Sequence, residues 1–179
     1  MSAYSKWWNT PGARVHRARV LLLASALILG GCADAGDSTT GIPPGAADGL
    51  YPQIVVSAPS ASTAEVTVSL LRKPRGVRLG SYQGEFTYDP SVLTLERWSL
   101  PAGVDGAVND ETAGRIRFVG TALDGVGEVP LLTLRFQRRQ PIKAQQLAVS
   151  FQEVSAADHF SDLTTLVFVG APAVSVPSR

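Results

Sequence analysis

Apolar residues alternate with polar ones along nearly all of the chain after Tyr51. Ile54, Val56 and Ala58 show the pattern first, and it recurs in short runs toward the C-terminus. A period of two places successive side chains on opposite faces of a strand, so each run predicts one face against a core and one face toward water. The predicted strands are 53–58, 65–70, 81–88, 93–95, 115–118, 132–136, 147–152, 166–169 and 174–176.

Short polar interruptions separate these runs. Gly, Pro, Asn and Asp break the alternation at short intervals, as hairpin and sandwich connections require. After residue 50 no segment shows the apolar spacing of a helix, although 89–93 has room for a single helical turn. Eight or nine short strands with almost no helix predict an all-β fold of two packed antiparallel sheets.

The N-terminal part of the chain has a different composition. A basic segment precedes a short apolar run, 20–29, which leads into Leu29-Gly30-Gly31-Cys32. This order is typical of a secretory signal, and the run is shorter than the about 20 apolar residues that span a bilayer. The last four residues resemble a bacterial lipobox, which implies cleavage before Cys32 and acylation of its sulfur. The alternative is an ordinary cleaved signal with a chance cysteine.

The lipobox resemblance also carries an expectation about location. In lipoproteins of this type an acidic residue directly after the cysteine often retains the protein in the inner membrane, whereas this chain has Ala33 there. Two or more acyl chains hold a protein durably, at about 0.8 kcal/mol per buried methylene. We therefore expect a lipid anchor at Cys32 in the cell envelope, in the outer membrane of a Gram-negative bacterium.

Composition divides the chain into three parts. We expect a signal peptide over 1–31, the lipidated cysteine with a flexible linker over 32–49, and one domain over 50–179. The linker has little to bury, and as a coil of about 17 residues it spans roughly 20–25 Å. Four of the 16 basic residues and none of the 15 acidic residues lie in 1–31, so the rest has a net charge of −3. This charge argues against a nucleic-acid partner, and a single cysteine allows no disulfide within the chain.

One segment carries a more specific signal. Residues 81–93, SYQGEFTYDPSVL, place an alternating aromatic strand before Tyr-Asp-Pro, a small residue and Val-Leu. This segment resembles the signature strand and turn of cohesin domains, and 114–120 and 131–136 are similar to the strands that follow it in that family. The resemblance covers residues 51–176. It implies a nine-stranded jelly-roll sandwich that binds a partner and does not catalyse a reaction.

The resemblance also indicates where a partner would bind. Cohesins of cellulosomes bind dockerin modules through the outer face of the sheet that contains this strand. The outward positions fall at Ser81 and Gln83, and these depart from the amide or acidic residues that are frequent there, which weakens the case for a classical dockerin. The expected contacts, all of them exposed on that face, are Ser81, Gln83, Glu85, Arg115 and Arg117.

Five arginines have two interpretations. Arg115, Arg117, Arg135, Arg138 and Arg139 are expected to point outward from the middle strands. They could form a patch that binds carboxylates of a partner, or they could be charges that protect an edge strand from aggregation. The sequence favours the second interpretation without excluding the first.

The sequence shows no convincing catalytic or metal-binding motif. His159 has Ser155, Asp158 and Asp162 nearby in sequence, but triad residues meet through folding, with the nucleophile on a constrained turn. The oxygen-rich segment 105–111 lacks the spacing of a calcium loop and is expected to be a solvated loop. We expect no enzyme activity, no cofactor and no metal site.

Two binding functions remain open. The first is binding of another envelope or secreted protein, including a dockerin-like one, through an exposed sheet face. The second is attachment to a polysaccharide, with Trp98 stacking on a sugar ring, because Trp98 alternates with Thr94 and Glu96 toward solvent. Trp98 is the only tryptophan after the leader, and packing at a strand end is a simpler role for it.

Overall fold

The computed structural model describes residues 42, 45–73, 75–169 and 173–175. The predictions for the signal peptide, for Cys32 and for most of the linker lie outside these residues. Ala35–Arg179 forms one compact unit, and every member of its hydrophobic core lies between Leu50 and Val174. Among the described residues no helix is long and apolar enough to span a membrane.

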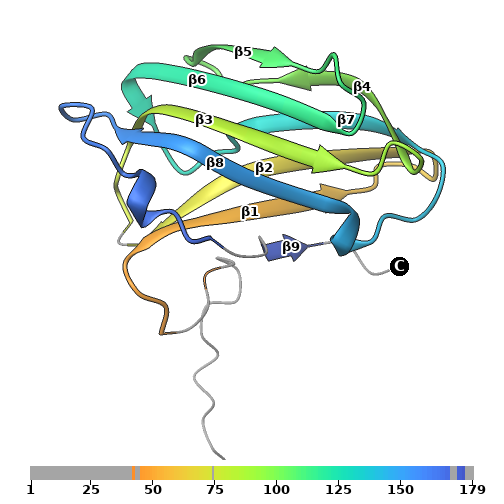
Figure 1. The fold of residues 1–179 in the computed structure, drawn as a ribbon, viewed down its shortest axis with the longest axis horizontal. Coiled ribbons are helices and arrows are strands. Elements are labelled where there is room, and N and C mark those ends of the chain that lie inside the picture. The colour runs from red at the N-terminus through yellow and green to blue at the C-terminus, as the bar shows by residue number, and fades with distance from the viewer. Residues whose placement is uncertain (1–41, 43–44, 74, 170–172, 176–179) are drawn as a thin grey trace, which may run out of the picture. The chain divides into compact units, whose positions relative to one another are not determined.

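The described strands form two sheets, which face each other in Figure 1. The five-stranded sheet has the order β4-β7-β2-β1-β9. Its strands are β1 (Gly49–Ser57), β2 (Thr63–Lys73), β4 (Leu93–Ser99), β7 (Leu132–Arg138) and β9 (Ala173–Ser175). The four-stranded sheet has the order β5-β6-β3-β8. Its strands are β3 (Leu79–Tyr88), β5 (Asp105–Asn109), β6 (Arg115–Val126) and β8 (Leu147–Ala156).

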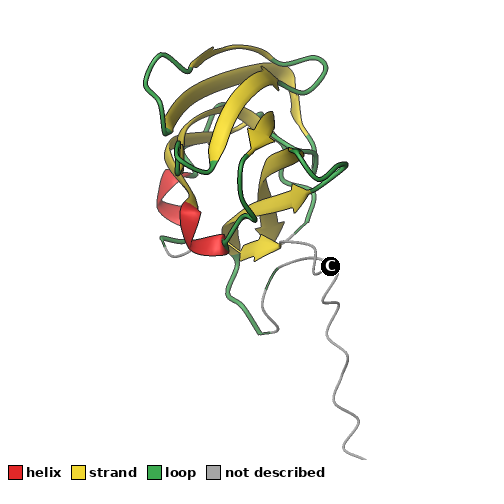
Figure 2. Cartoon of the chain, turned by 90° about the vertical axis from the view of Figure 1, so that its right-hand side faces the viewer, coloured by secondary structure: helices red, strands yellow, loops and turns green. Residues whose placement is uncertain are grey.

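Helical structure in the described part of the chain is limited to two short 3-10 turns. They are η1 (Ala144–Gln146) and η2 (Thr164–Leu166), and Figure 2 shows how little of the fold they occupy beside the strands. The prediction of an all-β sandwich with nine strands is therefore confirmed for the described residues.

The predicted alternation gives the sandwich its core. Along β2 every second residue from Ala64 to Arg72 is buried, and on β3 the buried positions include Tyr82 and Phe86. Ile54 pairs with Val68 across β1 and β2, whereas Phe86 pairs with Ile116 across β3 and β6. The buried rows of both sheets meet in one cluster, so the hydrophobic effect fixes the register of each strand.

The signature segment packs as the sequence indicates. Phe86 is fully buried, and the ring of Tyr88 lies 4.9 Å from that of Phe136 on the opposite sheet, centroid to centroid. The carboxylate of Asp89 accepts hydrogen bonds from the amide and hydroxyl of Ser91, at 2.9 and 2.6 Å. These bonds hold the Asp89 carboxyl pKa below its ordinary value, and they close the single turn that leads into β4.

Three parts of the sandwich differ from the sequence prediction. The strand β9 pairs with β1 in parallel, so the five-stranded sheet is mixed and not wholly antiparallel. Residues 166–169 form no strand, since η2 ends at Leu166 and only Val167 makes an isolated bridge, to Leu50. The segment 105–109, expected as a loop, is the edge strand β5.

Candidate functional site

One face of the four-stranded sheet carries all five residues predicted to contact a partner. The side chains that alternate with the buried rows of β3, β5, β6 and β8 point away from the core. We call this surface the open face. Its members are Ser81, Gln83, Glu85, Thr87, Asp105, Ala107, Asn109, Arg115, Arg117, Val119, Thr121, Ala148, Ser150 and Glu153.

A small charge cluster lies on the open face. The Nε atom of Arg117 lies 3.2 Å from one carboxylate oxygen of Glu85, and the Nε atom of Arg115 lies 3.6 Å from the other. Glu85 is a neighbour of Arg117 in the register of β3 and β6. Exposed pairs of this kind contribute about 0–1 kcal/mol to stability. One carboxylate against two guanidinium groups leaves one net positive charge, which suits an acidic group of a partner.

An apolar hollow of about 270 Å³ adjoins this cluster. Its lining includes Gln83, Ala107, Asn109, Arg117 and Val119. Val119 is 39% exposed and, with Leu123, is one of two large aliphatic side chains in the exposed row of β6. A second hollow of about 200 Å³ is lined partly by Glu85 and Gln152, and Gln83 and Arg117 line both hollows.

Ser81 differs from the other four predicted contacts. Its hydroxyl lies 2.7 Å from the hydroxyl of Ser155 on β8, and the bond is partly buried. Ser81 therefore helps to join β3 to β8, in addition to its place on the open face.

Sequence reasoning missed Val119 and Ala107, which belong to the apolar lining of the hollow. Val119 stood directly after the predicted strand 115–118, and the pairing of Ala107 with Val119 required β5 to be recognised as a strand.

Four of the five arginines lie on interior strands. β6 lies between β5 and β3, and β7 lies between β4 and β2, so Arg115, Arg117, Arg135 and Arg138 belong to interior strands. The edge interpretation is therefore wrong for these four. Arg138 has a local role, because its guanidinium donates to the carbonyl oxygens of Ala61 and Ser60, at 2.7 and 3.1 Å. Only Arg115 and Arg117 lie on the open face.

The loop that contains His159 is held by its own polar groups. Thr164 lowers the pKa of the Asp162 carboxyl, first through its side-chain hydroxyl and then through its amide, which donates to the carboxylate at 2.8 Å. His159 and Phe160 both have positive φ angles, 56° and 49°, so this turn is tight for residues other than glycine. Within the described ranges no group of three or more His, Cys, Asp or Glu side chains is placed to hold a metal ion.

Trp98 lies away from the open face, on β4 of the five-stranded sheet. It is 40% exposed. Its register partner on β7 is the buried Leu134, and the edge position of β4 leaves part of the side chain accessible. The two predicted binding surfaces, one for protein and one for sugar, therefore lie on different sheets.

Comparison with solved structures shows which fold this is. The sixth cohesin of scaffoldin B from Acetivibrio cellulolyticus, in complex with a mutant Cel5 dockerin, matches with a TM-score of 0.51 and 14% identity over 71% of this chain and 99% of that chain. CaCohA2 from Clostridium acetobutylicum matches with a TM-score of 0.50 and 19% identity over 72% of this chain and 91% of that chain. No family model matches the sequence, and no curated protein matches it. The chain has the cohesin fold.

Proposed function

We propose that this cohesin-fold chain is a lipid-anchored, non-catalytic module of the cell envelope that binds another protein through its open face. The observation that carries the proposal is the apolar hollow beside the Glu85–Arg115–Arg117 cluster. The side chains of Val119, Arg115 and Arg117 are exposed, and no other described element of the chain covers them.

The chemistry of the open face suits a protein partner. A hollow of about 270 Å³ accommodates one or two aliphatic side chains, and burying one stabilises a complex by about 1.5–3 kcal/mol. The surrounding Gln83, Asn109 and Arg117 offer hydrogen-bond donors and a positive charge at its rim. An apolar centre with a polar rim is the usual anatomy of a protein interface.

The fold supports the same proposal. The Acetivibrio cellulolyticus cohesin that this chain resembles is in complex with a dockerin. The sequence resemblance to cohesins implies binding through the outer face of the sheet that contains β3, which in this chain is the open face. A dockerin-like protein is one such partner, although Ser81 and Gln83 differ from the residues frequent at those positions and Ser81 bonds to Ser155, which weakens the case for a classical dockerin. The expected partner carries an apolar side chain next to an acidic one.

The anchor would hold this face in reach of other envelope proteins. Acylation of Cys32 would fix the N-terminus to the membrane, and the linker would allow the domain to move some 20–25 Å from it. We propose the outer membrane as the location, because Ala33 follows the cysteine.

A capture experiment with matched variants tests the binding face. The unit of residues 35–179 is immobilised, and envelope and secreted proteins of the organism that carries the gene are passed over it. Val119→Arg fills the hollow with a long charged side chain, whereas Gln53→Arg places the same side chain on the outer row of β1 in the other sheet. We expect a partner that the unchanged unit and the Gln53→Arg variant capture and that Val119→Arg loses.

Two outcomes would reject the proposal. A partner retained equally by both variants would place binding elsewhere, and the absence of any captured protein would remove the basis for a protein-binding function. Circular dichroism of both variants must show an unchanged strand content, so that misfolding is not mistaken for lost binding.

A further inference from the structure

The edge strand β5 leaves one side of the four-stranded sheet open. Protected edge strands carry bulges, are covered by other segments or are very short. β5 pairs with β6 without a register shift over Asp105–Asn109, and no described segment pairs with its outer side. It lies along the top of Figure 1, and four of its five residues are exposed. Its outward backbone N–H and C=O groups are thus available to another strand.

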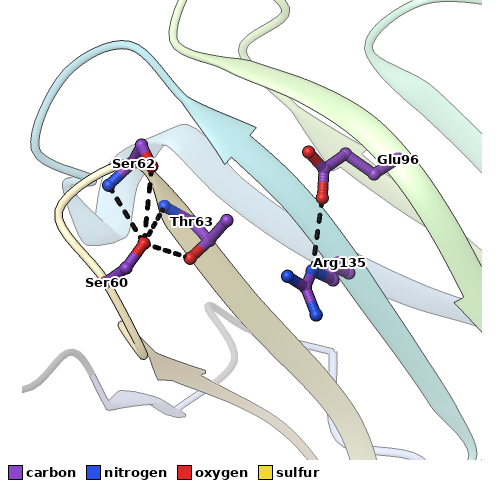
Figure 3. A network of polar contacts seen from close by, with 5 residues as sticks. All are labelled: Ser60, Ser62, Thr63, Glu96 and Arg135. Atoms are coloured by element: carbon purple, nitrogen blue, oxygen red, sulfur yellow. Dashed lines mark hydrogen bonds and ion pairs between the residues drawn. The ribbon is translucent and has the colours of Figure 1, made fainter.

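The other three edge strands are each protected. The strand β9 has only three residues. In β4 the register shift leaves Glu96 as an extra residue, and its carboxylate accepts a hydrogen bond from the Nε atom of Arg135 at 3.2 Å (Figure 3). A loop bonds to the C-terminal half of β8, where the amide of Leu163 donates to the carbonyl oxygen of Val154 at 2.8 Å. Among the described edges, β5 is therefore the one suited to pairing.

The sequence of β5 is complementary to itself in the antiparallel direction. With a two-fold axis at Ala107, all five residues of two copies pair, and Ala107 lies opposite its own copy. Asp105 then lies opposite Asn109 of the second copy, and Gly106 opposite Val108. Directly opposite side chains share a face, with Cβ atoms about 4.5–5.5 Å apart. No like charges face each other in this register, whereas an axis at Gly106 or Val108 would leave two residues of each strand unpaired.

The two polar side chains of β5 have unused groups that match. The carboxylate of Asp105 has no hydrogen-bond or ion-pair partner among the described residues, since Thr121 donates to its backbone carbonyl. The side-chain oxygen of Asn109 accepts from the amide of Glu111 at 3.2 Å, which leaves the NH2 group to donate. Arg117 lies beside Asn109 on β6, so the Asp105 carboxylate would face a donor with a positive charge behind it.

We propose that two copies of this chain associate through β5 into a dimer that joins their four-stranded sheets. The row Val119–Ala107 of each copy then meets that of the other, so the apolar linings of the two hollows adjoin. The outer faces of both sheets stay uncovered. The dimer goes beyond the proposed partner binding and does not require it, and it would offer two open faces side by side. Two linked sites bind a repeated partner more durably than one site does.

Disulfide cross-linking tests the position of the axis. The 35–179 unit contains no cysteine, and Ala107→Cys places two thiols opposite each other, with Cα atoms about 4.5 or 5.5 Å apart and within disulfide reach. Asp105→Cys is the matched control, because its two thiols would lie four residues apart along the strands, about 13 Å. We expect mild oxidation to link Ala107→Cys at least about tenfold faster. A mixture of Asp105→Cys and Asn109→Cys should link across the two variants. Equal rates for Ala107→Cys and Asp105→Cys would overturn the proposal.

A charge swap tests the pairing without a covalent bond. In sedimentation velocity of the 35–179 unit from about 1 µM to about 1 mM, the dimer fraction should rise with concentration. Asn109→Asp sets two carboxylates opposite each other in both halves of the dimer and should weaken association about tenfold. Adding Asp105→Asn exchanges the two groups and should restore the dimer. Gln53→Glu, on the outer row of β1, is the control and should leave association unchanged.

The outcomes separate this dimer from partner binding. A unit that stays monomeric over the whole concentration range would overturn the dimer, and so would an Asn109→Asp variant that associates as the unchanged unit does. Circular dichroism of each variant must show an unchanged strand content. Capture of a partner on the open face is measured separately, so a monomeric unit that still captures its partner would reject the dimer alone.

Discussion

The aromatic ring of Phe118 occupies the space that a side chain at Gly84 would need. The two residues are neighbours across β3 and β6, and a Cβ atom at Gly84 would overlap the ring of Phe118. The next core-facing pair along the same strands reverses the arrangement, because the ring of Tyr82 covers Gly120. Two large rings thus fit beside two glycines within one thin core.

This arrangement predicts the effect of a single methyl group. Gly84→Ala should lower the free energy of unfolding by about 1–3 kcal/mol, because an overfilled core must shift its rings or its backbone. Urea denaturation of the 35–179 unit measures the change. Gly127→Ala is the matched control, since no atom lies within 4 Å of a Cβ there, and it should change stability little. Equal stability of both variants would contradict the packing described for Phe118.

Tyr82 predicts a dependence on pH. Its buried hydroxyl donates to the carbonyl oxygen of Leu131 at 2.9 Å, and burial raises the pKa of the phenol. Above about pH 10 the unfolded chain loses the Tyr82 proton while the folded chain keeps it, so this residue's contribution to stability falls as the pH rises. Tyr82→Phe should cost about 1 kcal/mol at pH 7, and the difference should shrink above pH 10. Urea denaturation at pH 7, 9, 10 and 11 measures it, and a constant difference would contradict the assignment.

Arg72 predicts a stabilising substitution. Its side chain is 1% exposed, its three guanidinium nitrogens have no hydrogen-bond partner among the described residues, and burial lowers its pKa. Because a buried guanidinium without hydrogen-bond partners is costly, and the attraction of Glu128 does not offset the burial, Arg72→Met should raise the free energy of unfolding by about 1–3 kcal/mol in urea denaturation. Arg78→Met should lower it, since Arg78 donates to the carbonyl oxygens of Asp124 and Gly125. A less stable Arg72→Met variant would show that the guanidinium has a partner that this account lacks.

The anchor is tested in whole cells. Cys32→Ser in the full chain should move the protein from the membrane pellet to the soluble envelope fraction, because no acyl chain can then be attached. The unchanged chain should incorporate a labelled fatty acid and the variant should not. Tight membrane association of Cys32→Ser would contradict the lipoprotein interpretation.

The strands of the core could be predicted from the sequence because burial on one face imposes a period of two. Tyr82 and Phe86 on β3, and Ile116 and Phe118 on β6, show it plainly. The strand β5 could not be predicted, since only Val108 among its five residues is even partly buried. The apolar run 166–169 is the opposite case, because it has the composition of a strand and forms none. Val167 packs against the core and makes only an isolated bridge, to Leu50.

The candidate site was predictable in part for the same reason. Ser81, Gln83 and Glu85 on one strand, and Arg115 and Arg117 on its neighbour, share a face because each set follows a period of two. The hollow forms where three strands lie side by side. Val119 on β6 pairs with Ala107 on β5 and with Gln83 on β3. Such pairing follows from sheet order and register, which no single segment reveals.

Protection of introduced cysteines tests the central claim most directly. The 35–179 unit contains no cysteine, so Gln83→Cys and Gln53→Cys each place one thiol on an outer row, the first on the open face and the second on β1 of the other sheet. The rate of maleimide labelling is measured for each with and without the captured partner. The account predicts that the partner slows labelling at position 83 at least tenfold and leaves position 53 unchanged. Unchanged labelling at position 83, or protection at position 53 alone, would contradict it.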